Sequence, residues 1–362
     1  MSPKPELRIA LLGQGFMGKA HSNAYAQVSR FFDIPFKLRL KVLCGTNAET
    51  LQRSAETWGW EETAIDWRSV VERNDIDLVD IALPNHLHPE AAIRAATAGK
   101  VVLCEKPLAN TLEEALRMAA AARQVPNMVW FNYRRVPAIA YAKQLIDAGK
   151  LGQPYHYRGL YLQQWGPDKR RPVNWKMSRA EAGSGVVGDL LSHSIDLALF
   201  LNGKVARLTA STKIFAEGRE VEDAALLLTE FANGSIGTIE ASRYAIGSRN
   251  RNTFEISGLG GMLRFDLEDL NRLEFFDATD PSPLQGERNL LVTDPQHPYG
   301  RDFWKPGHIL GYEHTFIAAL ADFLSTLTSG EPFHPNFDDG VAVQQVLAAV
   351  LRSANSQRWE TV

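Results

Sequence analysis

Apolar and polar positions in the first third of the chain alternate between two kinds of segment. Short apolar runs, typical of buried strands, are each followed by a stretch with helical spacing of its apolar residues. The predicted strands are Leu7–Leu12, Leu38–Cys44, Leu78–Ala82, Val101–Cys104 and Met128–Phe131, and the predicted helices are Phe16–Ser29, Ala48–Trp58, Glu90–Ala98 and Thr111–Arg123. Such alternation with short links predicts a parallel sheet covered by helices.

The pattern changes after about residue 150, where strands follow one another directly. The predicted strands are Tyr155–Gln164, Val205–Phe215, Ala224–Phe231, Ser235–Tyr244, Thr253–Ser257, Met262–Phe265 and Arg272–Phe276, with helices at Pro137–Ala148, Gly188–Leu201, Glu313–Thr326 and Gly340–Ser353. Asn233-Gly234 between two apolar runs predicts a hairpin, and Asp277–Pro306 is expected to be a long loop. We therefore expect an α/β protein with a parallel-sheet domain at 1–134 and a second domain at 135–362, whose large open sheet is mostly antiparallel.

Composition and charge exclude several function classes. The chain has 362 residues, of which 45% are hydrophobic and 22% charged, and its net charge is −3. A chain with this charge lacks the surplus of basic residues that is typical of nucleic-acid-binding proteins. No apolar run approaches the ~20 residues of a membrane helix. The first residues carry no apolar signal core. Cys44 and Cys104 each end an apolar run, which favours buried thiols in a cytoplasmic protein over a disulfide.

A glycine-rich loop stands between the first predicted strand and helix. Gly13-Gln14-Gly15-Phe16-Met17-Gly18 has the spacing G-x-G-x-x-G. The first glycine permits a tight turn, the second lets a pyrophosphate approach the backbone, and the third allows close helix–strand packing. Free amides at the start of the helix then face the anion. This context favours a dinucleotide site over a turn with a purely structural role.

The acidic residue that usually ends the second strand and binds the adenosine ribose is missing. The strand ends Val42-Leu43-Cys44-Gly45-Thr46-Asn47, with no carboxylate and no arginine immediately after it for a 2′-phosphate. Thr46 and Asn47 are candidates for binding the ribose hydroxyls, and a role as turn residues alone is an equal alternative. NAD is the expected cofactor, with NADP left open.

Two loops follow the third and fourth strands, at the edge where a doubly wound sheet binds its ligand. Lys106 in Glu105-Lys106-Pro107 is a candidate ligand contact, although position alone leaves a surface lysine equally open. Pro84-Asn85-His86-Leu87-His88 contains two histidines, but no third ligand with metal-site spacing is evident. We therefore expect no metal site.

Asp189, His193 and Asp196 recur at spacings of four and three in an apolar segment, which predicts one shared helix face. An aspartate one turn before a histidine can orient the imidazole and tune its pKa toward neutrality, as a general acid–base for an alcohol requires. Two alternatives stay open. One is a core histidine bonded to a carbonyl group, with the aspartate favoured by the helix dipole; the other is a metal-binding pair.

These motifs occur together in the order typical of one family. The sequence resembles the Gfo/Idh/MocA family of glucose–fructose oxidoreductases and inositol dehydrogenases over nearly the whole chain, through the glycine fingerprint, Pro84-Asn85-x-x-His88, Glu105-Lys106-Pro107, Asn132-Tyr133-Arg134 and Asp189-x-x-x-His193. The resemblance implies a Rossmann domain, then an α/β domain whose open sheet often forms the oligomer interface. It implies hydride transfer between a nicotinamide and a hydroxyl-bearing carbon of a sugar or cyclitol. Gly45 departs from the many NAD-using relatives that carry an acid there.

The resemblance also implies roles for individual residues. His193 would be the acid–base on the reacting oxygen, Asp189 would orient it and bind a neighbouring hydroxyl, and Lys106 would stabilise negative charge on the substrate oxygen. The residues implied at the cofactor are Gly13, Gly15, Phe16, Met17, Gly18, Thr46, Asn47, Pro84, Asn85, His88, Glu105, Lys106 and Asn132.

Four segments resemble the branch of this family that contains levoglucosan dehydrogenase: Phe131–Pro137, Tyr161–Trp165, Asn174–Lys176 and Gly307–His308. The implied substrate-binding residues are Lys106, Tyr133, Arg134, Trp165, Trp175, Lys176, Asp189, His193 and His308. Aromatic faces suit the apolar faces of a pyranose, and plain core packing is the alternative for each tryptophan. We expect a sugar, anhydrosugar or cyclitol substrate and a homo-oligomer, a dimer or tetramer, formed through the second sheet.

Two other functions remain open on the sequence. Some relatives use NAD transiently to labilise a glycosidic bond and act as net hydrolases or lyases, and a non-catalytic nicotinamide-binding sensor would keep the cofactor site alone. Stoichiometric accumulation of NADH distinguishes a dehydrogenase from both.

Overall fold

The computed structural model describes residues 3–168 and 175–362, which form two compact units. The first unit contains the chain up to residue 132 together with residues 312–342, and the second contains residues 133–311 and 343–362. The predicted α/β architecture, a parallel sheet followed by a larger and mostly antiparallel one, is confirmed.

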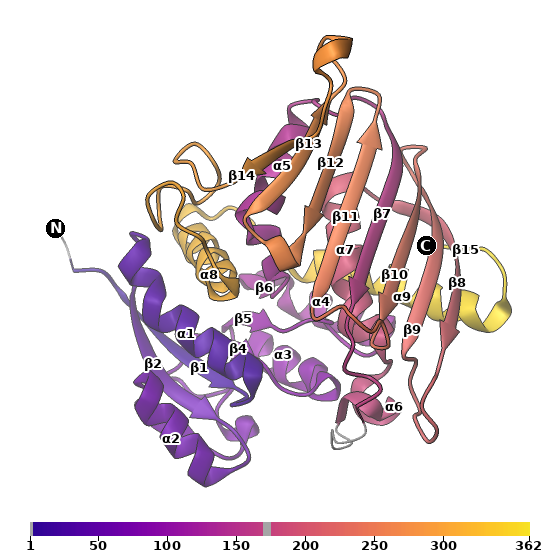
Figure 1. Ribbon diagram of the computed structural model, residues 1–362. Helices are drawn as coiled ribbons and strands as arrows, with labels where there is room; N and C mark the ends of the chain where they lie inside the picture. The colour runs from indigo at the N-terminus through magenta and orange to yellow at the C-terminus, as the bar shows by residue number, and fades with distance from the viewer. Residues whose placement is uncertain (1–2, 169–174) are drawn as a thin grey trace. The chain divides into compact units, whose positions relative to one another are not determined.

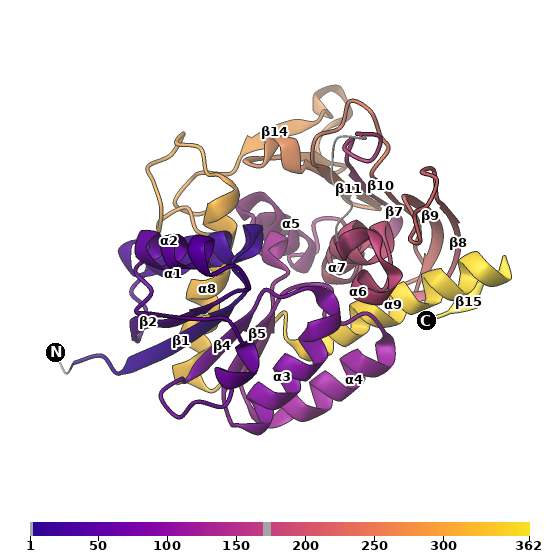
Figure 2. The ribbon, with the colours of Figure 1, turned by 90° about the horizontal axis from the view of Figure 1, so that it is seen from below.

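The first unit is built on a six-stranded sheet in the order β3-β2-β1-β4-β5-β6, in which each neighbouring pair is parallel. Its strands are β1 (Glu6–Leu12), β2 (Lys37–Cys44), β3 (Glu62–Ala64), β4 (Leu78–Ile81), β5 (Val101–Cys104) and β6 (Asn127–Val129). Its helices include α1 (Phe16–Phe31), α2 (Ala48–Trp58), α3 (His88–Thr97), α4 (Leu112–Ala121) and α8 (Tyr312–Ser329). Figure 2 shows α1 and α2 on one face of the sheet and α3 and α4 on the other.

Local sequence signals account for several boundaries in this unit. Thr111 and Glu114 form the expected capping box at the start of α4: the Thr111 Oγ1 accepts the Glu114 N–H, and the Glu114 carboxylate accepts the Thr111 N–H. The three-residue strand β3 was not expected, because three residues are too few to show a period. Residues 312–342 belong to this unit rather than to the second, where the sequence placed them, because α8 packs against α1.

The second unit is built on a nine-stranded sheet in the order β14-β13-β12-β11-β7-β10-β9-β8-β15. Its strands are β7 (Pro154–Leu162), β8 (Val205–Lys213), β9 (Ala224–Phe231), β10 (Ile236–Ser242), β11 (Arg251–Gly258), β12 (Gly261–Asp266), β13 (Arg272–Asp277), β14 (Arg288–Leu291) and β15 (Glu360–Thr361). The pair β7–β10 is parallel and the other pairs are antiparallel. The predicted Asn233-Gly234 hairpin joins β9 to β10, with Gly234 at φ 88°.

Helices α5 (Pro137–Asp147) and α7 (Ser192–Asn202) pack on the second sheet (Figure 1). Helix α9 (Phe337–Ser356) begins in the first unit and continues into the second, where the Ser353 hydroxyl accepts the Ala210 N–H of β8. The segment expected to be one long loop, Asp277–Pro306, contains β14, which pairs with β13 at the sheet edge. Edge strands are short and polar, so they leave a weak pattern in the sequence.

One helical stretch of the described chain, Arg179–Asn202, has the length and mean hydropathy, 1.3, of a membrane-crossing helix. However, 83% of the 18-residue segment with this hydropathy is buried inside the protein, as in the core helix of a soluble protein. Both cysteines are buried free thiols, and burial raises the pKa of each above its ordinary value.

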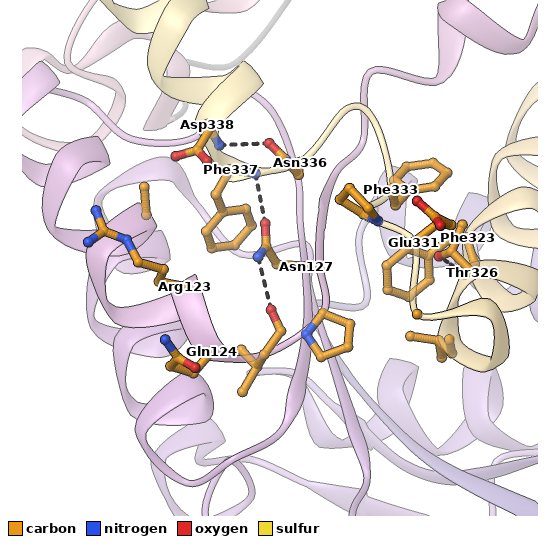
Figure 3. A pocket seen from close by; sticks show the side chains of 16 residues that line it. Arg123, Gln124, Asn127, Phe323, Thr326, Glu331, Phe333, Asn336, Phe337 and Asp338 are labelled. Atoms are coloured by element: carbon orange, nitrogen blue, oxygen red, sulfur yellow. Dashed lines mark hydrogen bonds between the residues drawn. The ribbon is translucent and has the colours of Figure 1, made fainter.

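A cavity of about 400 Å³ lies at the amino end of β6, between α4 and the segment that leads from α8 to α9 (Figure 3). Asn127 joins its two walls, since its Nδ2 donates to the carbonyl groups of Ala122 and Val125 while its Oδ1 accepts the Phe337 N–H at 2.8 Å. The carboxyl ends of parallel strands bind ligands in such sheets, so we assign this amino-end cavity a structural role.

We predict that Asn127→Ala destabilises the first unit without affecting chemistry. The substitution removes three hydrogen bonds to backbone groups, of which the Ala122 carbonyl keeps the Val125 N–H, at a cost of about 2 kcal/mol. A melting temperature several degrees lower than that of Gln124→Ala, an exposed neighbour on the same cavity wall, is expected in thermal denaturation. Equal melting temperatures for the two variants would contradict this role.

Candidate active site

The glycine loop has the geometry of a pyrophosphate cradle. Gly13 lies at φ +122°, and a Cβ there would stand 2.2 Å from the Ala82 carbonyl oxygen. A Cβ on Gly18 would stand 2.0 Å from the Gly13 carbonyl oxygen, whereas a Cβ on Gly15 would meet nothing within 4 Å. Helix α1 starts directly at Gly15 with no side-chain cap and no acid in its first turn. Its first amides are therefore available to an anion, and the residues present fit a dinucleotide.

The region after β2 is arranged differently from the usual acidic ribose site. A Cβ on Gly45 would overlap the Gln14 side chain, whose Nε2 donates to the Thr50 hydroxyl at 2.6 Å. Among the described residues, the buried Gln14 Oε1 has no hydrogen-bond partner. The Asn47 Oδ1 accepts the Thr50 N–H and so caps α2, while Thr46 is exposed. Asn47 thus has a structural role as a helix cap, which was not predicted, and ribose binding by Thr46 and Asn47 stays a prediction.

A buried charged cluster, not anticipated from the sequence, lies at the carboxyl ends of β4 and β5. The His21 ring nitrogens face Asp80 Oδ2 and Glu105 Oε1, each at 3.0 Å, and the His21 ring has no exposed surface. Asp80 also accepts hydrogen bonds from the Tyr25 hydroxyl and the Trp130 indole, both at 2.9 Å. Burial alone would lower the pKa of His21, but the two carboxylates outweigh burial and raise this pKa to about 9.

Hydrogen bonds from buried side chains hold the loops that follow β4 and β5. The Lys106 N–H donates to Glu105 Oε2 at 3.0 Å, and Lys106 itself is half-buried. The buried His88 ring lies between the carbonyl oxygens of Leu83 (2.9 Å) and Pro107 (3.2 Å) and can donate a hydrogen bond to one of them in its neutral form. Burial lowers the pKa of His88 and favours its neutral form. Asn132 is buried and donates to the Thr315 hydroxyl at 2.8 Å.

His88 and Asn132 thus hold backbone elements in place, and a direct contact of either residue with the cofactor stays a prediction. The same holds for the remaining candidates here: Asn85 is buried, Pro84 precedes the short helix Asn85–Leu87, and Phe16 is 70% exposed beside Tyr312.

In the second unit, the segment that carries Asp189 begins at a buried carboxylate. Glu222 Oε1 accepts the N–H groups of Gly185 and Val187 at 2.7 and 3.0 Å, as an acid at a helix start should. The segment Val187–Leu191 is a π-helix that runs into α7. Such wide turns are frequent at functional sites. The predicted continuous α-helical spacing from Asp189 to His193 is therefore interrupted by this turn.

Asp189 is held between two cations. Its Oδ1 lies 3.1 Å from the Lys176 Nζ and its Oδ2 lies 3.1 Å from the Arg243 Nη2. Arg243 is fully buried, and its Nε and Nη1 have no hydrogen-bond partner among the described residues. The Arg243 guanidinium lies 4.9 Å from the centre of the Trp165 ring. Arg243 was missed, because a lone arginine after a strand carries no signal in the sequence.

His193 lies in an aromatic setting, with ring centres 4.6 Å from Tyr133 and 5.8 Å from Tyr161. A chain of hydrogen bonds leads outward from these rings, from Tyr133 through Tyr161, Asn250 and Gln163 to the Trp165 indole. Lys176 also lies 5.7 Å from the centre of the Trp175 ring. The structure therefore brings together most of the substrate-side candidates of this unit, which are Tyr133, Trp165, Trp175, Lys176, Asp189 and His193.

Arg134, which was predicted to bind substrate, has a structural role instead. Its side chain is 6% exposed and forms a buried ion pair with Asp196, the third member of the predicted polar stripe, at 2.6 Å. Its guanidinium also lies 5.0 Å from the centre of the Phe200 ring. We therefore assign Arg134 and Asp196 to holding α7 in place rather than to substrate binding.

The remaining candidates of this unit lie elsewhere. His308 lies in the exposed loop after β14, where its Nδ1 faces the Lys305 carbonyl oxygen at 2.9 Å; the contacts of the described chain do not join it to the other candidates. Asn174 lies outside the described residues. No group of three or more His, Cys, Asp or Glu side chains within residues 3–168 and 175–362 is arranged to hold a metal ion.

Comparison with known proteins gives the family. Residues 7–133 match the model of the oxidoreductase family with an NAD-binding Rossmann fold, and residues 139–264 match the GFO/IDH/MocA C-terminal domain. The chain belongs to the Gfo/Idh/MocA family. Its relatives include levoglucosan dehydrogenase of Pseudarthrobacter phenanthrenivorans, 38% identical over 98% of each chain.

Solved structures of Gfo/Idh/MocA proteins agree with this fold. A levoglucosan dehydrogenase in complex with NADH and levoglucosan superposes with a TM-score of 0.96 at 40% identity over 99% of each chain. An oxidoreductase domain protein from Kribbella flavida superposes with a TM-score of 0.96 at 44% identity, also over 99% of each chain. The predictions of this family, of NAD as cofactor and of an NAD-dependent oxidoreductase are confirmed.

We predict that Gly15→Ala weakens NAD binding without unfolding the protein. The new Cβ meets no protein atom within 4 Å, but it occupies the space through which a pyrophosphate approaches the backbone. The expected result is an NAD dissociation constant at least tenfold higher by fluorescence titration, with an unchanged melting temperature in the absence of NAD. Unchanged NAD affinity would show that the pyrophosphate does not lie against this glycine.

Proposed function

We propose that this chain is an NAD-dependent dehydrogenase that oxidises a hydroxyl-bearing carbon of a cyclic sugar, with levoglucosan, an anhydrosugar, as the first substrate to test. The observation that carries the proposal is the cluster in the second unit, in which a histidine and a doubly paired aspartate stand among tyrosine and tryptophan rings. The 38% identity to a levoglucosan dehydrogenase over 98% of both chains supports the choice of substrate.

The chemistry of this cluster suits a small polyol. Aromatic rings pack well on the apolar faces of a pyranose, and a few placed polar groups fix its orientation. Tyr133, Trp165 and Trp175 supply the rings, while Lys176 and Asp189 supply hydrogen-bonding charges. Asp189, which is held by Lys176 and Arg243, offers its carboxyl oxygens as hydrogen-bond acceptors for a substrate hydroxyl.

The proposed mechanism divides the work between residues. The imidazole of His193 takes the proton of the reacting hydroxyl as general base, since histidine is the side chain with the suitable pKa range. The ammonium of Lys106 stabilises the negative charge that develops on that oxygen. The backbone amides at Gly15 and the start of α1 would hold the pyrophosphate of NAD. When bound, the nicotinamide supplies the hydride acceptor.

Alanine substitutions of the proposed catalytic residues test these roles. We predict that Lys106→Ala and His193→Ala each lower kcat at least ~100-fold, the contribution typical of general acid–base and charge-stabilising groups. The NAD dissociation constant of both variants stays within about threefold of wild type. Formation of NADH at 340 nm is measured against levoglucosan, other anhydrosugars, sugars and inositols, with NAD and with NADP.

The same assay distinguishes the alternatives. A dehydrogenase forms one NADH for each product molecule, whereas an NAD-cycling hydrolase forms product without NADH and a sensor forms neither. Wild-type turnover by either alanine variant would remove the role proposed for that residue.

We also propose that the chain works in the cytoplasm as a homo-oligomer, a dimer or tetramer, formed through the outer face of the second sheet. Leu226, Leu228 and Ile236 of β9 and β10 are each more than half exposed on neighbouring strands. Beside them, a row of ion pairs crosses four strands from Arg158 through Glu255 and Arg264 to Glu274. An apolar patch rimmed by ordered charges is typical of an interface.

A charge placed in the patch tests this assembly. We predict that Leu228→Glu lowers the molar mass measured by light scattering toward that of the monomer, because a buried unpaired carboxylate is costly. The matched control is Leu284→Glu, which alters a leucine that is 74% exposed in the short helix Ser282–Leu284 and should leave the mass unchanged. A wild-type monomer, or an unchanged mass in Leu228→Glu, would contradict this interface.

A further inference from the structure

The buried cluster around His21 brings three ionisable side chains into direct contact. Asp80 of β4 and Glu105 after β5 approach the two opposite nitrogens of one imidazole, each at 3.0 Å. A carboxylate accepts hydrogen bonds and does not donate them. Two ionised carboxylates can both be satisfied only if His21 carries a proton on each nitrogen. The two distances fit an imidazolium that bridges two buried acids.

The two carboxylates, and not the apolar surroundings, favour this ionised form of His21. The rings of Trp130 and Phe316 lie 4.3 and 5.7 Å from its ring centre and exclude water. The titratable groups that face His21 are Asp80 and Glu105, while the Tyr25 hydroxyl donates to Asp80 and the buried Cys104 and His88 lie close enough to interact with these acids. Burial and the neighbouring Asp80 raise the pKa of Tyr25, so it stays neutral.

The second oxygen of Glu105 links this cluster to the lysine loop. Glu105 Oε1 faces the His21 ring, while Glu105 Oε2 accepts the N–H of Lys106 at 3.0 Å. The Glu105 N–H also donates to the Ile81 carbonyl oxygen at the end of β4. The orientation of the Glu105 carboxylate thus decides where the Lys106 backbone lies. His21 belongs to α1, the helix that starts at Gly15, so one residue connects the dinucleotide loop with the lysine loop.

We propose that His21 is a positioning residue for Lys106: its imidazolium, held by Asp80, fixes the Glu105 carboxylate that binds the Lys106 N–H. This inference rests on the proposed function only where it concerns turnover, because the effect on the Lys106 backbone does not require a known substrate. Removing the positive charge leaves two buried carboxylates without a counter-ion, one of which must then take up a proton or turn away. In either case Glu105 no longer holds Lys106 in the same place, and the ammonium loses its alignment with the substrate oxygen.

The kinetic test is a double-mutant cycle between His21→Gln and Glu105→Gln. We expect His21→Gln to lower kcat at least tenfold while the NAD dissociation constant changes less than threefold. If His21 acts through Glu105, the double variant is no slower than the slower single variant. Tyr25→Phe, which deletes a neutral hydrogen bond to the same Asp80 oxygen, is the matched control and keeps kcat within twofold. Multiplicative effects in the double variant, or wild-type kcat in His21→Gln, would overturn the proposal.

A second measurement does not depend on turnover. Hydrogen exchange of the Lys106 amide, followed by NMR, is expected to be at least tenfold faster in His21→Gln than in wild type and unchanged in Tyr25→Phe. In ¹⁵N-histidine spectra at pH 7.5, both His21 nitrogens are expected to carry protons. A neutral His21, or unchanged Lys106 exchange, refutes the positioning role. If the wild type reduces no NAD with any sugar while both NMR results hold, the proposed function fails and this inference stands.

Discussion

A charge removed from water must be paired, and this requirement governs how the functional residues of both units are held. In the first unit, three donors surround Asp80, and one of them, His21, also fixes Glu105 beneath Lys106. In the second unit, Arg134 and Asp196 anchor α7, while Glu222 anchors the π-helix that presents Asp189. The residues proposed to bind the substrate, Lys106, Asp189 and His193, lie close in the chain to these paired groups.

The cavity at Asn127 is not the proposed site. The Asn127 side chain in its wall is already hydrogen-bonded to the backbone, and the cavity lies at the amino end of β6. The proposed chemistry lies at the carboxyl ends of β1, β4 and β5, where the strand carbonyls and helix amides of a parallel sheet converge on a ligand. In the second unit, polar groups with unusual partners, above all the clamped Asp189, indicate the site more clearly than cavity shape.

Features set by short-range interactions could be predicted from the sequence. The glycine loop, the capping box at Thr111 and the hairpin at Asn233-Gly234 each depend on residues within six positions, and each has the predicted geometry. The strands β3 and β14 were missed because three or four residues at a sheet edge show no clear period. The return of α8 to the first unit depends on packing against α1, which no local pattern records.

The long-range pairs could not be predicted in the same way. His21 is 59 residues from Asp80 and 84 from Glu105, so their association depends on the strand order of the sheet. Arg134 was taken for a substrate ligand because its neighbours form a motif, and nothing local shows that Asp196, 62 residues away, binds it. Arg243 reaches Asp189 across 54 residues. The sequence motifs could predict which residue types take part in the chemistry. They could not predict which side chains are paired, because these pairs form only in the tertiary structure.

A hydride that passes directly from a sugar carbon to NAD carries the hydrogen isotope of that carbon with it. Levoglucosan deuterated at every carbon is turned over with NAD, and the nucleotide product is analysed by mass spectrometry. We expect NADH that carries one deuterium from the sugar, together with a ketone product that has lost it. Unlabelled NADH, or a sugar product formed without net reduction of NAD, would show that this chain is not such a dehydrogenase.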